Sequence, residues 1–357
     1  MLSNLNKAPK PIKVLVVDDS AVVRRIFTKE LSKYDGIEIV GGAIDPYVAR
    51  EKILRLKPDV ITLDIEMPRM DGLSFLAKLM KYYPLPVIIC SSLAPEKSPT
   101  ALRALQMGAV EVISKPASRF STPDILRMVR AIRAASQARV QKQLPANGEQ
   151  AQLHSHDLSQ LETTHKILAI GASTGGTVAI EKVLRGLPPN MPGTVLVQHM
   201  PADFTTSFAE RLDRVCRMRV REARDGDTLV PGLALLAPGN RHMLLMRSGA
   251  RYYVQIKDGP PVHHQRPAVD VLFYSVARQA GTNAVGVILT GMGADGAKGM
   301  LAMRESGAIT LAQDEASCVV FGMPKEAIQT GAAEQVVPLD CMPKSILDAL
   351  SSKDSAH

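Results

Sequence analysis

The sequence predicts an α/β protein made of two parallel β-sheets, each flanked by helices. A chain of 357 residues has the length of two ordinary domains, since one domain takes about 150 residues. In both halves, short apolar runs rich in β-branched residues alternate with stretches of helical periodicity, which is typical of a parallel sheet. Several of these runs end in acidic, hydroxyl or basic residues, at the strand ends where such folds place their sites. We therefore expect two α/β domains, each with a polar site at one edge of its sheet.

The composition is typical of a globular protein that does not enter the membrane. Hydrophobic residues make up 46% of the chain and charged residues 22%, and no apolar run approaches the ~20 residues needed to cross a bilayer. The N-terminal stretch lacks the apolar core and cleavage site of a signal peptide. We expect a cytoplasmic protein with no direct membrane insertion. Its four widely spaced cysteines are expected to be reduced: Cys90, Cys216, Cys318 and Cys341.

The formal net charge of +8 does not by itself predict a nucleic-acid-binding protein. Basic residues are dispersed, and aromatic residues, which stack on bases, make up only 4% of the chain. The densest basic patch runs from Arg211 to Arg224 and is interleaved with acidic residues, which is typical of a solvated face. The alternative is a surface that attracts an acidic protein substrate. We expect no nucleic-acid partner.

The first half contains predicted strands separated by helical stretches. Ile12–Val17 is apolar, β-branched and ended by two aspartates, which predicts a buried strand of a parallel sheet. A helix is expected next, because apolar residues follow at spacings of three and four: Val22, Val23, Ile26, Phe27 and Leu31. Further predicted elements are a helix at 48–55 and strands at 37–40, 60–63, 87–90 and 110–113. This alternation favours a doubly wound sheet.

Polar residues stand at the carboxyl ends of these strands. Asp18, Asp19 and Asp64 each follow an apolar run, and carboxylates clustered at one edge repel one another unless a cation lies among them. All-oxygen ligation favours Mg²⁺. Ser91 and Lys115 follow two later strands, where a hydroxyl and an ammonium would complete a site that holds a phosphoryl group. A lone aspartate at a strand end is often only a helix N-cap, but five such residues indicate a site.

Residues 12 to about 130 resemble a response regulator receiver domain, which has a flavodoxin-like fold. The resemblance rests on the strand-end residues and on the stretch Asp64-Ile-Glu-Met-Pro-Arg-Met-Asp-Gly72. It implies that a histidine kinase phosphorylates Asp64 and that Mg²⁺ is held by Asp18, Asp19 and Asp64. It further implies that Ser91 is the switch hydroxyl and that Lys115 contacts the phosphoryl group.

Residues 131–165 are predicted to form a linker. They are rich in Gln, Ser and Asn and carry no sizeable apolar cluster, so they cannot bury enough surface to order themselves independently. A helix near 125–132 is expected to continue into the start of this linker. The second domain is expected to span residues 166–350.

The second domain begins with a buried strand at 167–170 that leads into Gly171-Ala-Ser-Thr-Gly175. This G-x-S-x-G pattern favours a sharp strand-to-helix turn that exposes the Ser173 hydroxyl while neighbouring N–H groups stay free to hold an oxyanion. A strand, a glycine-rich turn and a helix also describe a phosphate- or dinucleotide-binding loop. The stretch alone supports both interpretations.

Two later strand ends supply partners for Ser173. A strand at 194–198 is followed by His199, and a strand at 284–289 leads into a glycine-rich loop that contains Asp295. Each residue alone would more often be structural, Asp295 as a helix N-cap. Together the three offer a hydroxyl to attack, an imidazole to accept its proton and a carboxylate to orient the imidazole. The chain order Ser, His, Asp differs from that of α/β-hydrolases, in which the acid precedes the histidine.

Other parts of the second half predict scaffold. Helices are expected at 176–187 and from near Pro267. Short strands with Gly and Pro punctuation between Thr228 and Lys257, including Leu233–Ala237 and Arg251–Ile256, predict a β-hairpin insertion beside the main sheet. No role is assigned to the histidines of this region: His242, His263 and His264.

Residues 166 to about 350 resemble the catalytic domain of the chemotaxis protein-glutamate methylesterases, the CheB family. The matching stretches are Gly171–Gly176, Gln198-His-Met-Pro201 and Thr290-Gly-Met-Gly-Ala-Asp-Gly296. The resemblance implies a Rossmann-like hydrolytic domain in which Ser173 is the nucleophile, His199 the general base and Asp295 the orienting acid. It also implies that the backbone N–H of Met292 is an oxyanion donor.

The two resemblances together imply a phosphorylation-activated serine hydrolase of bacterial chemotaxis. Its expected substrates are glutamate methyl esters, and certain glutamines, on the cytoplasmic part of methylated chemoreceptors. A chemotaxis histidine kinase is the expected phosphodonor, Mg²⁺ is expected at the receiver site, and the ester chemistry is expected to need no cofactor. Two other hypotheses are a receiver joined to a nucleotide-binding domain and a receiver-linked transcription factor. Against these, His199 ends the strand where a dinucleotide fold has an acidic residue, and no helix-turn-helix signature is evident.

Overall fold

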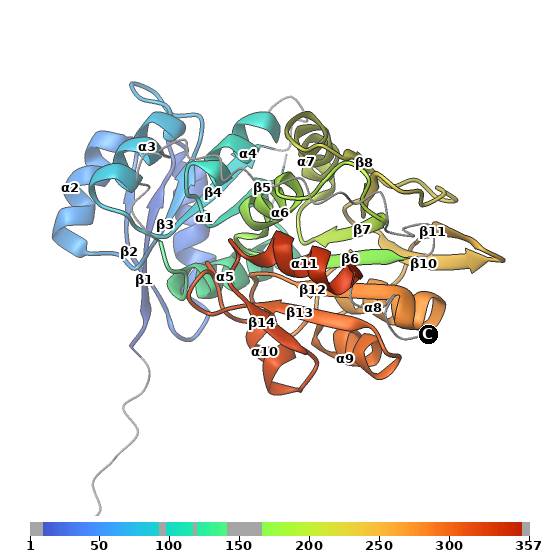
Figure 1. Cartoon of the computed structure of the whole chain (residues 1–357). Helices are drawn as coiled ribbons and strands as arrows, with labels where there is room; N and C mark the ends of the chain where they lie inside the picture. The colour runs from blue at the N-terminus through green and yellow to red at the C-terminus, as the bar shows by residue number, and fades with distance from the viewer. Residues whose placement is uncertain (1–9, 93–97, 117–119, 141–165, 352–357) are drawn as a thin grey trace, which may run out of the picture. The chain divides into compact units, whose positions relative to one another are not determined.

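The structure is a computed structural model that describes residues 10–92, 98–116, 120–140 and 166–351. The chain forms two compact units, the first made of residues 1–93 and 103–144 and the second of residues 94–102 and 145–357 (Figure 1), and each is described by itself. Most of the predicted linker, residues 141–165, lies outside the described residues. Among the described helices, none is both long and apolar enough to cross a membrane. All four cysteines are free.

The first unit is a five-stranded parallel sheet with strand order β2-β1-β3-β4-β5. Its strands are β1 (Ile12–Val17), β2 (Ile37–Ala43), β3 (Val60–Asp64), β4 (Val87–Ser92) and β5 (Glu111–Lys115). The helices along this half of the chain are α1 (Ala21–Leu31), α2 (Pro46–Leu56), α3 (Gly72–Tyr82), α4 (Ser98–Gln106) and α5 (Thr122–Ser136). This is the flavodoxin-like order, and the predicted fold class is confirmed.

The core of this unit follows the apolar pattern with one departure. Phe27 and Leu31 of α1 are buried as expected, but Val22, predicted on the same face, is 66% exposed. Helix α5 continues to Ser136 and takes in the first residues of the predicted linker, as expected. The extension is stable as helix because Ile132, Ala134 and Ala135 are buried, and burial of an apolar face supplies most helix stability.

The second unit is a seven-stranded parallel sheet with strand order β14-β13-β12-β6-β7-β9-β8. Its strands are β6 (Ile167–Ala172), β7 (Gly193–Gln198), β8 (Arg219–Glu222), β9 (Leu233–Leu236), β12 (Ala284–Ile288), β13 (Ile309–Gln313) and β14 (Gln335–Val337). Its helices are α6 (Gly176–Arg185), α7 (Ala202–Val215), α8 (Val269–Ala280), α9 (Ala297–Glu305), α10 (Met323–Gln329) and α11 (Met342–Ser351). The chain adds β7 on one side of β6 and later β12 on the other, so the strand order reverses at β6.

The hairpin prediction is right for one pair of strands and wrong for a single strand, Leu233–Leu236. Strands β10 (His242–Ser248) and β11 (Arg251–Lys257) form a separate antiparallel pair. Leu233–Leu236, assigned by sequence to the same insertion, instead pairs parallel with β7 and β8 inside the main sheet. The partner of so short an apolar run depends on distant parts of the chain, which its local pattern does not encode.

The helices of the two units begin in different ways. In the first unit, side chains at the N-cap accept a backbone N–H of the first turn of α1, α2, α3 and α5; these residues are Ser20, Asp45, Asp71 and Ser121. In the second unit, α6, α8 and α9 begin after Gly175, Ala268 and Gly296, and no side chain of these residues caps them. The first N–H groups of α8 and α9 are bound by side chains from other elements instead.

Candidate functional site

Ser173, His199 and Asp295 lie at the carboxyl ends of adjacent strands. Ser173 follows β6, His199 follows β7, and Asp295 stands in the loop after β12, where β12, β6 and β7 are neighbours in the sheet. The strand order reverses between β12 and β7, the position at which open α/β sheets form their ligand sites.

The turn that carries Ser173 is held from both neighbouring strands. The Ser173 N–H donates to the Thr290 carbonyl oxygen (3.0 Å), and its carbonyl oxygen accepts from Gln198 Nε2 (2.8 Å). Glycine is required beside it, since a Cβ on Gly291 would lie 2.7 Å from the Cβ of Ser173. Gly175 has φ +78°, a conformation that glycine adopts without strain. The serine is therefore fixed by backbone geometry, and its hydroxyl has no hydrogen-bond partner among the described residues.

His199 and Asp295 form a buried pair. His199 Nε2 lies 2.8 Å from Asp295 Oδ2, and the two side chains are 5% and 2% exposed. The other ring nitrogen, Nδ1, is buried and has no partner among the described residues. Because Asp295 occupies Nε2, Nδ1 is the nitrogen left to exchange a proton with a hydroxyl.

The Asp295 carboxylate is also bound by the first N–H groups of α8. Oδ2 accepts from Val269 N (2.8 Å) and Oδ1 from Asp270 N (2.9 Å). Burial by itself raises the pKa of Asp295, but the hydrogen bond and charge of His199 and the two backbone N–H groups outweigh it and leave that pKa below its ordinary value. The carboxylate is therefore ionised near neutral pH, as an acid that orients an imidazole must be.

Met292 lies in the glycine-rich loop between β12 and Asp295. Its backbone N–H donates no backbone hydrogen bond among the described residues. The loop is held close to residues 322 and 323, whose N–H groups donate to the Gly291 carbonyl oxygen at 3.0 and 2.8 Å. This arrangement is compatible with an oxyanion donor at Met292.

The acidic cluster of the first unit also assembles. Lys115 Nζ lies 2.7 Å from Asp18 Oδ2 and 2.6 Å from Asp64 Oδ2, and carboxylate oxygens of Asp18, Asp19 and Asp64 lie within 4.8 Å of one another. Burial raises the pKa of Asp64, against the lowering effect of Lys115. Close carboxylates of which two are buried fit a hard cation with oxygen ligands, so these three residues would hold Mg²⁺. Ser91 pairs with Ser114 through the strand ladder, and its side chain lies outside the described part of the structure.

Residues 168–346 match the CheB methylesterase family, and residues 14–130 match the response regulator receiver domain family. The chain belongs to the CheB methylesterase family. A relative in Syntrophus aciditrophicus, protein-glutamate methylesterase/protein-glutamine glutaminase 2, is 60% identical over 94% of this chain and 98% of its own length. One in Geobacter metallireducens is 53% identical over 95% and 99% of the two chains.

A solved structure supports the fold of the second unit. The catalytic domain of the Thermotoga maritima CheB methylesterase is 38% identical, with a TM-score of 0.50, over 51% of this chain and 97% of its own. The receiver family match implies phosphorylation, with which Mg²⁺ binding is usually associated. Both resemblances inferred from the motifs are confirmed at the level of the family.

Sequence reasoning missed two residues that this CheB family member places behind Asp295. Asp270 lies at the start of α8, and its N–H holds the Asp295 carboxylate. His263, to which the sequence analysis assigned no role, has its Nε2 3.0 Å from Asp270 Oδ2. Neither residue ends a strand, so the strand-end rule did not select them. Asp270 also gave no signal of its own, because an aspartate in the first turn of a helix is common for electrostatic reasons alone.

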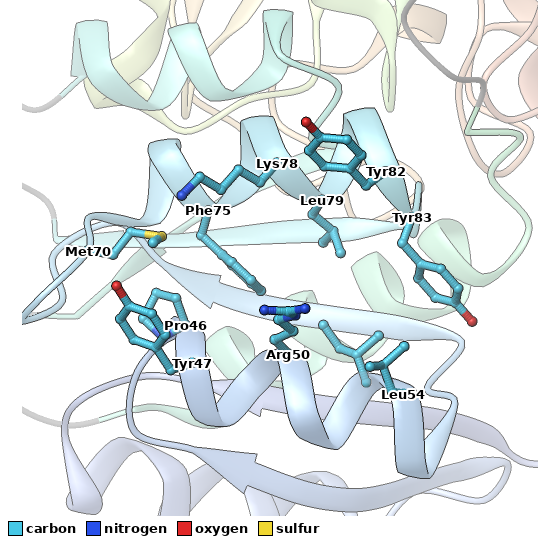
Figure 2. Close-up of a pocket in the computed structure, with 11 residues that line it drawn as sticks. Pro46, Tyr47, Arg50, Leu54, Met70, Phe75, Lys78, Leu79, Tyr82 and Tyr83 are labelled. Atoms are coloured by element: carbon cyan, nitrogen blue, oxygen red, sulfur yellow. The ribbon is translucent and has the colours of Figure 1, made fainter.

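The receiver-like unit has a groove that is separate from its acidic cluster. It lies between α2 and α3, has a volume of about 530 Å³ and is lined by none of the predicted site residues. Figure 2 shows aromatic and aliphatic side chains from both helices facing it, with two cations among them: Tyr47, Leu54, Phe75, Leu79, Arg50 and Lys78.

Two arginines of the basic patch in the second unit form ion pairs with carboxylates. Arg211 Nε lies 3.0 Å from Glu181 Oε2, and Arg221 forms an ion pair with Asp227. Arg219 and Arg221 belong to β8, an edge strand that sequence reasoning did not predict. Charges on an edge strand discourage pairing with other chains, which agrees with a solvated face.

Proposed function

We propose that this protein is a serine hydrolase that removes methyl esters from glutamate side chains of chemoreceptors and deamidates certain glutamines. The observation that carries the proposal is the buried His199–Asp295 pair, whose free Nδ1 lies at the same sheet edge as the Ser173 turn. The names of the relatives, which cover nearly the whole chain, support the same substrates.

The proposed reaction has two halves. The Ser173 hydroxyl attacks the ester carbonyl while His199 accepts its proton at Nδ1, and the Met292 N–H stabilises the resulting oxyanion. Collapse of the tetrahedral intermediate breaks the bond to the methoxy group, which receives the proton from His199 and leaves as methanol. A water then attacks the acyl-enzyme, with His199 again as base, and the glutamate carboxylate and the free serine are formed. A glutamine follows the same course with ammonia as the leaving group.

Release of methanol from methylated receptor fragments tests this function. The wild-type protein is expected to release methanol, and acetyl phosphate is expected to increase the rate. A fluorescent-nucleotide titration is run alongside. Nucleotide binding with no methanol release would favour the rival nucleotide-binding module.

We further propose that a chemotaxis histidine kinase phosphorylates the receiver domain on Asp64. Asp18, Asp19 and Asp64 would hold the Mg²⁺ that supports phosphoryl transfer by neutralising charge, and Ser91 and Lys115 would bind the phosphoryl group. Lys115, which bridges Asp18 and Asp64, supports this assignment. We propose domain limits of 12–130 and 166–350, with 131–165 between them, and the two family matches support them.

Asp64→Asn is expected to abolish stimulation by acetyl phosphate while leaving the unstimulated rate within about twofold of wild type. The amide cannot accept a stable phosphoryl group, and Asp64 belongs to the other compact unit from the ester chemistry. Methanol release with and without acetyl phosphate is the measurement. Asp35→Asn, an exposed aspartate of the same unit, is the matched control and should respond as wild type does. Full stimulation of Asp64→Asn would assign phosphorylation to another residue.

A further inference from the structure

A second histidine–aspartate pair lies directly behind the first. His263 Nε2 lies 3.0 Å from Asp270 Oδ2. One ring nitrogen of His263 and carboxylate oxygens of Asp270 and Asp295 all lie within 4.8 Å of one another. The remaining oxygen of Asp270, Oδ1, accepts from Gly299 N (2.7 Å) in the first turn of α9. Asp270 is thus joined to Asp295 through its backbone N–H and lies close to it through its carboxylate.

The two carboxylates place two negative charges in one buried region. The side chains of Asp295 and Asp270 are 2% and 4% exposed. The pKa of Asp270 lies above its ordinary value, chiefly because of burial and further because of the charge of Asp295. The hydrogen bond from the Gly299 N–H and the charge and hydrogen bond of His263 oppose this shift without reversing it. Hydrogen bonds from a backbone N–H and an imidazole favour the charged form of a carboxylate, so here they limit the rise in pKa that burial causes. Its charge then acts on its neighbours with little screening by water.

We propose that Asp270, held as a carboxylate by His263 and Gly299, is a positioning residue that raises the proton affinity of His199. Its N–H fixes the Asp295 carboxylate, and its charge adds to that of Asp295 on the side of the imidazole away from Nδ1. An imidazolium at His199 is thereby stabilised at the moment when Ser173 loses its proton. The inference rests on the proposed role of His199 as the general base.

The turn before α8 presents His263 to this carboxylate. Val262 and Gln265 close the turn with two hydrogen bonds (3.0 and 2.8 Å), and His263 and His264 between them have φ +50° and +62°. Residues other than glycine are uncommon in that conformation, and asparagine tolerates it best among them. His263 is 36% exposed, so it exchanges protons with solvent although its partner Asp270 is buried. His264 is exposed and shares the conformation, which makes it a control for the turn.

Other titratable and charged groups lie on the elements packed around the pair. Tyr274, on α8, has a pKa raised by burial and by the charge of Asp270. His242 of β10 binds the Ala268 N–H and the Pro260 carbonyl oxygen. The charged residues of the two packed helices are Arg278 near the end of α8, Lys298, exposed at the start of α9, and Arg304 and Glu305 at the end of α9, of which Arg304 binds the Gly331 carbonyl oxygen. Among the described residues, none of these side chains forms a hydrogen bond with Asp270.

The test is an NMR titration of the His199 ring in the full-length protein. Protein labelled with ¹³C-histidine is titrated, and the His199 signal is identified by its loss in His199→Gln. In Asp270→Asn, which keeps the backbone N–H and an oxygen for Gly299, the midpoint of the His199 titration is expected about one pH unit lower than in wild type. In His263→Asn the Asp270 carboxylate loses a hydrogen-bond donor and takes up a proton more readily. A smaller lowering of the His199 midpoint is therefore expected. His264→Asn should leave the midpoint unchanged.

Each result decides the inference. An unchanged midpoint in Asp270→Asn, or an equal shift in His264→Asn, would overturn it. If Asp270→Asn does not fold, the pair His263→Asn and His264→Asn decides it alone. Methanol release on the same samples separates the two proposals. If the His199 midpoint shifts in Asp270→Asn but the wild-type protein releases no methanol, the ester chemistry is rejected and the effect of Asp270 on His199 is kept. If the wild-type protein releases methanol but the midpoint does not shift in Asp270→Asn, the ester chemistry is kept and the effect of Asp270 is rejected.

Discussion

Ser173→Ala is expected to reduce methanol release from methylated receptor fragments by about 10⁴-fold or more. The hydroxyl is the only protein group in the proposed mechanism that bonds to substrate carbon. Its removal leaves only the oxyanion donor and substrate binding, which supply a small residual rate enhancement. Stability should change little. The hydroxyl has no hydrogen-bond partner among the described residues. The turn is held by hydrogen bonds of the residue 173 backbone N–H and carbonyl oxygen, which alanine retains.

Ser248→Ala is a matched control, because Ser248 is an exposed serine at the end of β10 in the same unit. It should keep the wild-type rate. Activity of Ser173→Ala within tenfold of wild type would remove Ser173 as the nucleophile. A fall in melting temperature of more than a few degrees would mean that the serine has a structural role that its contacts do not indicate.

Asp295→Asn is expected to lower the rate of methanol release by about 10³- to 10⁴-fold and also to destabilise the protein. Both oxygens of Asp295 accept hydrogen bonds, from His199 and Val269 on one side and from Asp270 N on the other. An amide in either orientation turns its NH₂ group toward a donor, so one N–H of α8 loses its partner. A buried unsatisfied donor costs about 1–3 kcal/mol, and an imidazole without its carboxylate is held in the wrong tautomer.

The pH dependence of this stability difference has a definite sign. The pKa of Asp295 in the folded protein lies below its ordinary value of 3.8, so the carboxylate contributes stability that is fully present above that value. The contribution is lost as the pH falls through the lower, folded-state pKa. Urea denaturation of wild type and Asp295→Asn should therefore show a difference that is constant near neutral pH and narrows below about pH 4. A difference that widens in acid would contradict the lowered pKa.

The sequence predicted the strand ends well because their chemistry is local. Asp64, His199 and Asp295 follow runs whose burial is readable from composition, and parallel strands bring their carboxyl ends to one edge without further information. The roles of Ser173, His199, Asp295 and Met292 stay predictions, which the experiments above address. The predicted metal cluster of Asp18, Asp19 and Asp64 does assemble.

What the sequence did not predict depends on contacts between distant segments. Leu233–Leu236 carries the pattern of a short strand, but its place between β7 and β8 is decided by partners about 15 to 40 residues away. Asp270 resembles any acidic residue in a first helical turn, and its contact with His263 requires two left-handed residues that the sequence His263-His264 does not suggest. The N–H of Met292 is a backbone group, for which residue type gives no signal.

The uncapped starts of α8 and α9 affect how the second domain tolerates change. A single substitution can remove a side-chain cap such as Ser20 or Asp45, whereas only substitution by proline removes a main-chain N–H. The donors that hold Asp295 come from Val269 and Asp270, and the donor that holds Asp270 comes from Gly299. Substitutions at Val269, Asp270 and Gly299 can therefore alter packing and charge, yet every residue except proline keeps the N–H groups that bind the carboxylates of Asp295 and Asp270.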